Sequence, residues 1–150
     1  IAVAGPGQHQ DTGSKAIHVV PNTSSIIRAK SISYGGGIAS YRGLVRVGPK
    51  AVGTVSSVAC DALILDGESQ SHTYPYIKVE NDDSEITHEA RTGRVGDREL
   101  FYAMSRGLTE EAALKMIVGG FVEEVSKKLP LEYAIEFNRL LDLQMEGAVG

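Results

Sequence analysis

The chain has 150 residues, of which 42% are hydrophobic, and a formal net charge of −4. This length suits one domain, or one domain with an appendage, and the negative charge argues against nucleic acid as a partner because phosphate binding demands clustered Lys and Arg. The single cysteine excludes an internal disulfide and no apolar run approaches the roughly 20 residues of a membrane helix, so we expect a cytoplasmic protein with no membrane insertion.

Residues 1–95 carry the hydrophobic pattern of β-strands. The chain opens at Ile1, as though already within a strand, and we expect an upstream part to be missing. Further along, alternating apolar runs are separated by turn residues that begin at Pro21, Gly48 and Asn81. The turns recur loosely, with 28 residues from Pro21 to Pro49 and 32 from Pro49 to Asn81. Such recurrence favours a parallel β-helix, a solenoid of stacked coils, and leaves an antiparallel sandwich as the alternative.

The run 55–66 contains the only cysteine and is predicted to be a strand. Alternation places Cys60 on one face with Val58, Ala62 and Ile64. Both faces are largely apolar, so we expect this strand to be covered on both sides. Composition alone favours Cys60 as core filler, because a lone free cysteine behaves as a small hydrophobe.

Residues 96–150 change to helical periodicity, and we expect a separate domain of three helices there. Asp97 is predicted to cap the first helix and Thr109 the second. Within the second helix, Gly119 and Gly120 indicate close packing against another backbone. Pro130 is predicted to open the third helix, which runs to about Glu146.

The buried stripe of the second helix is predicted to comprise Leu114, Ile117, Val118, Phe121, Val125 and Leu129. The third helix carries two apolar stripes, the first formed by Leu131, Ala134, Ile135, Leu141 and Met145. The second stripe is formed by Tyr133, Phe137 and Leu140. One stripe can be buried on the second helix, whereas the other is covered either by the strand region or by a partner protein.

Candidates for chemistry in the strand region are Cys60, the four histidines His9, His18, His72 and His88, and several acidic residues that include Glu89. The sequence contains no Cys-x-x-Cys or His-Glu-x-x-His metal motif and no phosphate loop. The adjacent His88 and Glu89, taken alone, are typical of a solvated surface pair.

Several segments, in the same order along the chain, resemble the C-terminal part of the SufB and SufD proteins, the paired scaffold subunits of the SUF iron–sulfur cluster assembly system. The segments are Asp11-Thr12-Gly13, Ser40-Tyr41-Arg42-Gly43-Leu44-Val45, Cys60-Asp61, His72-Thr73-Tyr74-Pro75-Tyr76, His88-Glu89-Ala90, Leu100-Phe101-Tyr102 with Arg106-Gly107, and Leu129-Pro130-Leu131-Glu132. Cys60-Asp61, His88-Glu89-Ala90 and the closing residues 146–150 look closer to SufB, since SufD has Ser-His-Gly-Ala where this chain has Thr-His-Glu-Ala.

The resemblance implies a right-handed parallel β-helix followed by a helical C-terminal domain. It implies a non-enzymatic scaffold in which Cys60 and Glu89 build a transient cluster at a subunit interface, while SufD contributes a histidine at the position matched by His88. It also implies that the C-terminal helices bind a SufC-like ATPase, which would cover Tyr133, Phe137 and Leu140. Further implied partners are a SufD-like paralogue or a second copy, through the β-helix, and sulfur donor proteins; no nucleotide is expected on this chain.

One thiol cannot hold an iron–sulfur cluster alone, so the remaining ligands must come from elsewhere. The reactive species is the thiolate, and Cys60 therefore needs some solvent access and a nearby cation, for which Arg42, Arg46 and Lys78 are candidates. Two other hypotheses stay open at this point. One is a carbohydrate-acting β-helix protein, and the other is a purely structural interaction module in which Cys60 is inert.

Overall fold

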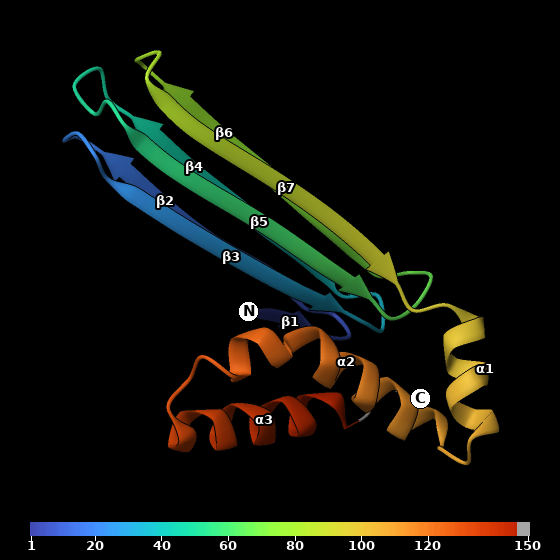
Figure 1. The fold of residues 1–150 in the computed structure, drawn as a ribbon. Helices are drawn as coiled ribbons and strands as arrows, with labels where there is room; N and C mark the ends of the chain where they lie inside the picture. Colours follow the sequence, from blue (N-terminus) through green and yellow to red (C-terminus); the bar gives the residue numbers. More distant parts are fainter. Residues whose placement is uncertain (147–150) are drawn as a thin grey trace.

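The computed structural model describes residues 1–146, and the closing residues 147–150 that favour the SufB branch lie outside this part. Seven strands form two sheets that face each other along a solenoid (Figure 1). Sheet A has the strand order β1-β3-β5-β7, and sheet B has the order β2-β4-β6. The strands are β1 (Ala2–Ala4), β2 (His9–His18), β3 (Ser24–Ser33), β4 (Ile38–Val47), β5 (Thr54–Ile64), β6 (Gln70–Val79) and β7 (Ser84–Arg94).

Every strand pairing is parallel, which confirms the predicted parallel β-helix and shows that the antiparallel sandwich was wrong. The register places Ala29 beside Cys60 and Cys60 beside Ala90, so one coil takes about 30 residues. The predicted turns at Pro21, Gly48 and Asn81 each follow the end of a sheet B strand. Residues one coil apart therefore stack on the same face of the solenoid.

The space between the two sheets forms the core of the solenoid. Its buried residues include Val45, Val47, Val58 and Cys60. The predicted shared face of β5 is confirmed, because Val58, Cys60, Ala62 and Ile64 are all buried, and it is the face that points between the sheets. The expectation that β5 is covered on both sides is wrong along most of its length. Its outward residues are half-buried or, at Val55, exposed, and the helices cover them only at Leu63 and, just beyond the strand, at Leu65.

The three helices are α1 (Asp97–Ser105), α2 (Glu110–Ser126) and α3 (Leu131–Met145). The Thr109 side chain accepts a hydrogen bond from the Ala112 amide, which confirms it as the cap of α2. The predicted cap of α1 is wrong by one position. Gly96 is the capping residue, without a side-chain bond, and Asp97 lies in the first turn, where the helix dipole favours its charge.

A second core joins α2 and α3 to the strands. Val118 of α2 and Met145 of α3 pack with Ile32 of β3, which is fully buried. The Tyr34 hydroxyl, just beyond β3, donates a 2.6 Å hydrogen bond to the carbonyl of Gln144. Because the helices and strands share this core, α2 and α3 are held beneath the strands as Figure 1 shows.

The predicted stripe of α2 is confirmed at Leu114 and Val118, which are buried, and Val122 joins them. The expectation of close backbone packing at Gly119 and Gly120 is wrong. Both are exposed, and a Cβ added at either position would meet nothing within 4 Å.

The two stripes of α3 are divided differently from the prediction. Phe137, assigned to the partner-facing stripe, packs against the core with Leu141 and Met145. Leu131 and Ile135, assigned to the buried stripe, are exposed. The reason is helical geometry: Phe137, Leu141 and Met145 follow at intervals of four residues and fall on one face, whereas Ile135, six residues before Leu141, lies about 120° away around the helix. None of the helices within residues 1–146 is long and apolar enough to cross a membrane.

Candidate functional site

Cys60 lies in the middle of β5 and points between the two sheets. It is only 5% exposed, and it borders a cavity of about 20 Å³, close to the space that one water molecule occupies. Hydroxyl-bearing side chains of sheet B, those of Thr12, Tyr41 and Thr73, line the same cavity. The only thiol therefore faces a small space inside the solenoid that hydroxyl-bearing residues line in part.

The electrostatic surroundings hold this thiol in its protonated form. Burial raises the pKa of Cys60, and the neighbouring Asp61 carboxylate raises it further. The cations expected to lower it lie elsewhere, on the outward side of sheet B, where Arg42 binds Asp11 while Arg46 and Lys78 bind Glu80. The expectation that these three would activate the thiol is therefore wrong for this structure.

Sequence reasoning missed the lysine that pairs with Asp61. Lys30 lies on the outward face of sheet A, opposite the face from which Cys60 points, because its register partner is Asp61 whereas that of Cys60 is Ala29. Its ammonium lies 3.2 Å from Asp61, and its side chain is 10% exposed. Lys30 and Asp61 are register partners on β3 and β5, one coil apart. A coil length of 31 residues, applied to the sequence, would have placed these two opposite charges side by side.

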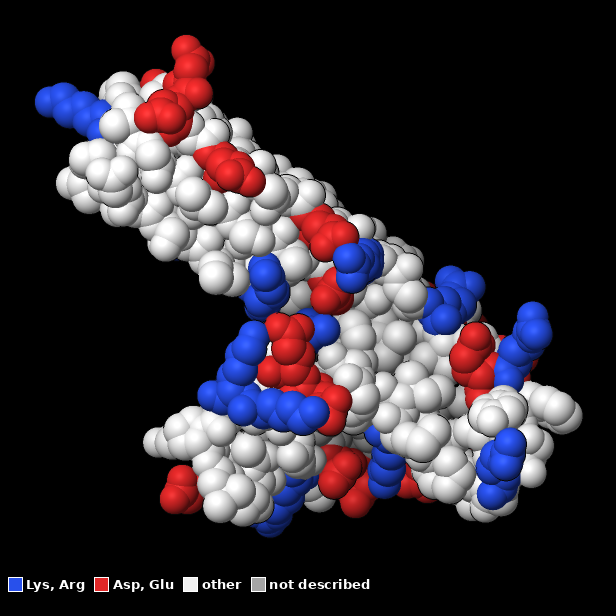
Figure 2. Space-filling view, viewed as in Figure 1, with Lys and Arg blue, Asp and Glu red and all other residues white. Residues whose placement is uncertain are grey.

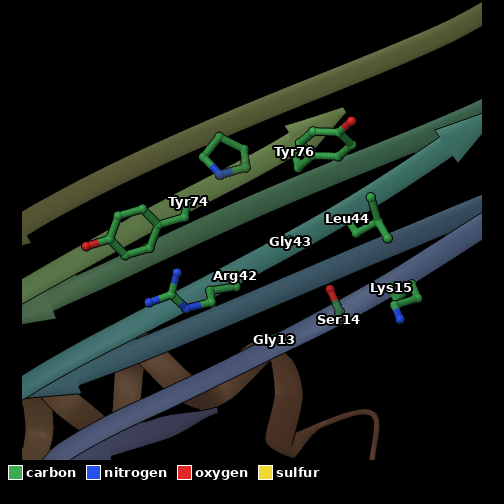
Figure 3. A pocket seen from close by; sticks show the side chains of 9 residues that line it. Gly13, Ser14, Lys15, Arg42, Gly43, Leu44, Tyr74 and Tyr76 are labelled. Carbon is green, nitrogen blue, oxygen red and sulfur yellow. The ribbon is translucent and has the colours of Figure 1, made fainter. Parts of the chain in front are cut away.

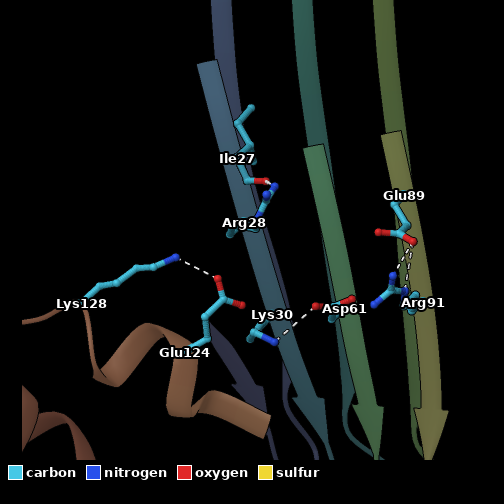
Figure 4. A network of polar contacts seen from close by, with 8 residues as sticks. All are labelled: Ile27, Arg28, Lys30, Asp61, Glu89, Arg91, Glu124 and Lys128. Atoms are coloured by element: carbon cyan, nitrogen blue, oxygen red, sulfur yellow. Dashed lines mark hydrogen bonds and ion pairs between the residues drawn. The ribbon is translucent and has the colours of Figure 1, made fainter. Parts of the chain in front are cut away.

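Lys30 also connects β5 to the helices. Its ammonium lies 4.5 Å from the centre of the Phe121 ring on α2, within the range of a cation–π interaction. Figure 4 shows the surrounding contacts, in which Glu124 of α2 binds Lys128 next to β3. Figure 2 shows that acidic and basic side chains lie next to each other where strands meet helices. Lys30 thus links the strand that carries Cys60 to α2, in addition to the contact that Leu63 makes with the helices.

His88 and Glu89 are neighbours on β7 and point to opposite faces of sheet A. His88 is in register with the inward-facing Val58, and it borders a small interior cavity with Ile77 of β6. Glu89 is in register with the outward Ala59 and binds Arg91 at 2.5 Å. The structure therefore brings His88, but not Glu89, to the same side of sheet A as Cys60.

The solenoid ends at β6 and β7, which have no further strand beside them within the described residues. Their residues are mostly exposed, including His88 and Glu89. Residues 1–146 contain no group of three or more His, Cys, Asp or Glu side chains that could hold a metal ion.

Together these features define a parallel β-helix with one interior thiol, an open final coil and a helical region docked beneath its strands. Residues 1–121 match the family model for the SUF system FeS cluster assembly, SufBD core domain. The chain belongs to the SufBD family, and the resemblance seen in the sequence is confirmed.

Named relatives match over the whole chain. The iron-sulfur cluster assembly protein SufB of Bacillus subtilis is 53% identical over 150 residues, which cover 100% of this chain and 32% of that protein. An iron-sulfur cluster assembly SufBD family protein of Mycobacterium tuberculosis is 57% identical over 150 residues, 100% of this chain and 18% of the relative. One of Staphylococcus aureus is 55% identical, covering 100% of this chain and 32% of the relative. The chain thus spans about a third or less of the length of these relatives.

Proposed function

We propose that this chain is the part of a SUF scaffold on which a nascent iron–sulfur cluster, the cargo of the system, is assembled. The observation that carries the proposal is Cys60 itself: the only thiol faces a small cavity, lined in part by hydroxyl-bearing residues, one strand away from the open final coil. A thiolate is the species that accepts iron or sulfur, and sulfur donor proteins would supply the latter. A free cysteine suits a reducing, cytoplasmic setting.

A second subunit supplies the missing ligands in this proposal. The outer edges of β6 and β7 present backbone N–H and C=O groups that a second β-helix can pair with. His88 would extend toward the cluster from the inward side of β7, while Glu89 would act from the outward side near the partner. The partner is a SufD-like paralogue or a second copy of this chain.

A movement must expose Cys60 before it can react, because the thiol is buried and protonated in this structure. We assign the driving force to ATP hydrolysis in a SufC-like partner rather than to this chain, which we infer to be non-enzymatic and free of bound nucleotide. The exposed residues of α3, among them Tyr133 and Leu140, offer its docking surface. Phe137 belongs to the internal core and contributes to that surface only through its exposed edge.

One alternative has an observation in its favour. The burial and raised pKa of Cys60 are also what an inert core cysteine would show, so a purely structural interaction module is the second candidate. The two candidates differ in whether the thiol becomes reactive in the assembled complex.

The test uses the full-length protein with its ATPase. Cys60→Ala should fold normally and lose the absorbance of a reconstituted cluster, whereas Ala62→Ser, a change on the same strand and face, should retain it. Labelling of Cys60 by a thiol reagent should be fast with ATP and slow without it. Unchanged cluster absorbance in Cys60→Ala would overturn the proposal, and slow labelling in both nucleotide states would favour the structural module.

A further inference from the structure

A groove of about 660 Å³ lies on the outward side of sheet B, away from Cys60 (Figure 3). It crosses β2, β4 and β6, and two register rows form its walls. One row contains Gly13, Arg42 and Tyr74, and the next contains Lys15, Leu44 and Tyr76. Gly13 lies so close to the Arg42 carbonyl oxygen that a Cβ would collide with it, so no side chain of this residue covers the groove at β2.

The first wall is held in place by a chain of contacts. Asp11 accepts two hydrogen bonds from Arg42, at 3.1 and 3.0 Å. The guanidinium of Arg42 lies 4.6 Å from the centre of the Tyr74 ring, and that ring stacks on His72 at a centroid distance of 6.2 Å. Such contacts fix the aromatic ring before any ligand arrives, which reduces the entropy cost of binding.

The second wall offers free binding groups. Tyr76 is 61% exposed, Leu44 is half-buried beside it, and Lys15 is exposed with no ion pair among residues 1–146. Tyr74 and Tyr76 are two residues apart on one strand, which separates their attachment points by about 6.6 Å. This spacing leaves room for one aliphatic side chain or proline ring between the two tyrosines.

The charge of this face is opposite to that of the chain as a whole. Its outward strand positions carry Lys15, Arg42, Arg46 and Lys78, whose carboxylate partners are Asp11 and Glu80 alone. The whole chain has a net charge of −4. A nucleic acid would need several cations without a carboxylate partner. Of the four cations on this face, Lys15 is the one that lacks such a partner among residues 1–146.

We propose that this groove binds an extended acidic segment of a partner protein. One carboxylate of the segment pairs with Lys15, and a neighbouring aliphatic or proline side chain lies between Tyr74 and Tyr76 over Leu44. Aromatic grooves of this kind bind extended peptides with little loss of ligand entropy. The inference concerns the outward side of sheet B and does not depend on the role of Cys60.

The test is a selection from a random twelve-residue peptide display library on the full-length protein, with counter-selection on its Lys15→Glu/Tyr76→Ala variant. Peptides kept by the wild type alone should be rich in Asp or Glu together with Pro, Leu or Val. A synthetic copy of the best peptide, followed by fluorescence anisotropy, should bind each single variant about tenfold more weakly. Lys50→Glu, an equal charge change in an exposed turn outside the groove, should leave its affinity unchanged.

Two results would overturn the proposal. One is a selection in which no peptide discriminates between the wild type and the double variant, or in which the discriminating peptides carry no acidic residue. The other is equal loss of binding in Lys50→Glu and Lys15→Glu, which would reduce the effect to overall charge. A labelled twelve-nucleotide thymidine strand that binds more tightly than the peptide, and is weakened by Tyr76→Ala, would assign the groove to single-stranded nucleic acid instead.

Discussion

Replacing Lys30 with methionine should destabilise the protein and show how strongly α2 is coupled to the strand of Cys60. The change keeps an unbranched side chain near Phe121 but removes the ammonium that lies 3.2 Å from Asp61. Losing one partner of a buried ion pair costs about 3–5 kcal/mol, because the remaining charge is left without compensation. The Asp61 side chain is 26% exposed and regains some hydration, so we expect a loss of about 2–3 kcal/mol in the free energy of unfolding.

Urea denaturation of the full-length protein measures this loss, with a double-mutant cycle through Asp61→Asn. The double variant should be less destabilised than the sum of the two single variants by about 1–3 kcal/mol. The control is Lys128→Met, which breaks an exposed pair with Glu124 and should cost less than about 0.5 kcal/mol. If Lys30→Met costs no more than this control, or if the cycle is additive, the pair does not connect β3 with β5 as argued.

Three further outcomes follow from local contacts. Asp61→Asn should lower the pKa of Cys60 and speed its labelling by a thiol reagent at pH 8. The rate should stay below that of a free thiol, because burial is the larger cause of the raised pKa. An unchanged pH–rate profile would contradict this prediction. Gly37→Ala should lower the free energy of unfolding in urea by at least about 1–3 kcal/mol, because its Cβ would collide with the Ala4 carbonyl oxygen. Gly119→Ala should instead stabilise α2 by up to about 1 kcal/mol. A Gly119→Ala variant less stable than Gly37→Ala would refute the packing described. Burial pushes the pKa of Asp66 upward, but hydrogen bonds, led by the one from the Ser69 amide, hold this pKa below its ordinary value. The carboxylate therefore stabilises the folded protein above about pH 4, and this stability is lost as the pH falls through the lowered pKa of the folded state. The urea midpoint should therefore fall more steeply below pH 4 in the wild type than in Asp66→Asn, and parallel curves would argue against the contribution.

The coil repeat could be predicted because turn residues interrupt the alternating runs at similar intervals. The intervals of 28 and 32 residues bracket the observed steps of 31 and 30, from Ala29 to Cys60 and from there to Ala90. Alternation also predicted which residues share a face with Cys60, since successive strand residues point to opposite faces. These inferences depend on local geometry, which a sequence carries directly.

The surroundings of a side chain depend on neighbours that are distant in sequence, and the predictions about these surroundings failed. Arg42, Arg46 and Lys78 were candidates for activating Cys60 because nothing in the sequence told sheet A from sheet B. Gly119 looked like a packing site, although no element lies against it. The exposure of β6 and β7 follows from their place in the final coil, which their own composition does not indicate.

The orientation of β7 determines which of the side chains of Cys60, His88 and Glu89 can contact the same cluster. Within one chain, Cys60 and His88 face the interior while Glu89 faces outward, and a side chain in a paired strand cannot reach through the sheet. On the proposed function, a cluster that contacts both Cys60 and Glu89 therefore requires β7 to separate from β5 or to shift by one residue, which would exchange its two faces. In the described part β7 pairs with β5 alone and most of its residues are exposed, so one set of ladder hydrogen bonds and the contact of Ile86 with the core oppose that movement. On the proposed function, we infer that the opening acts on this strand, because its separation or shift changes the face to which Glu89 points.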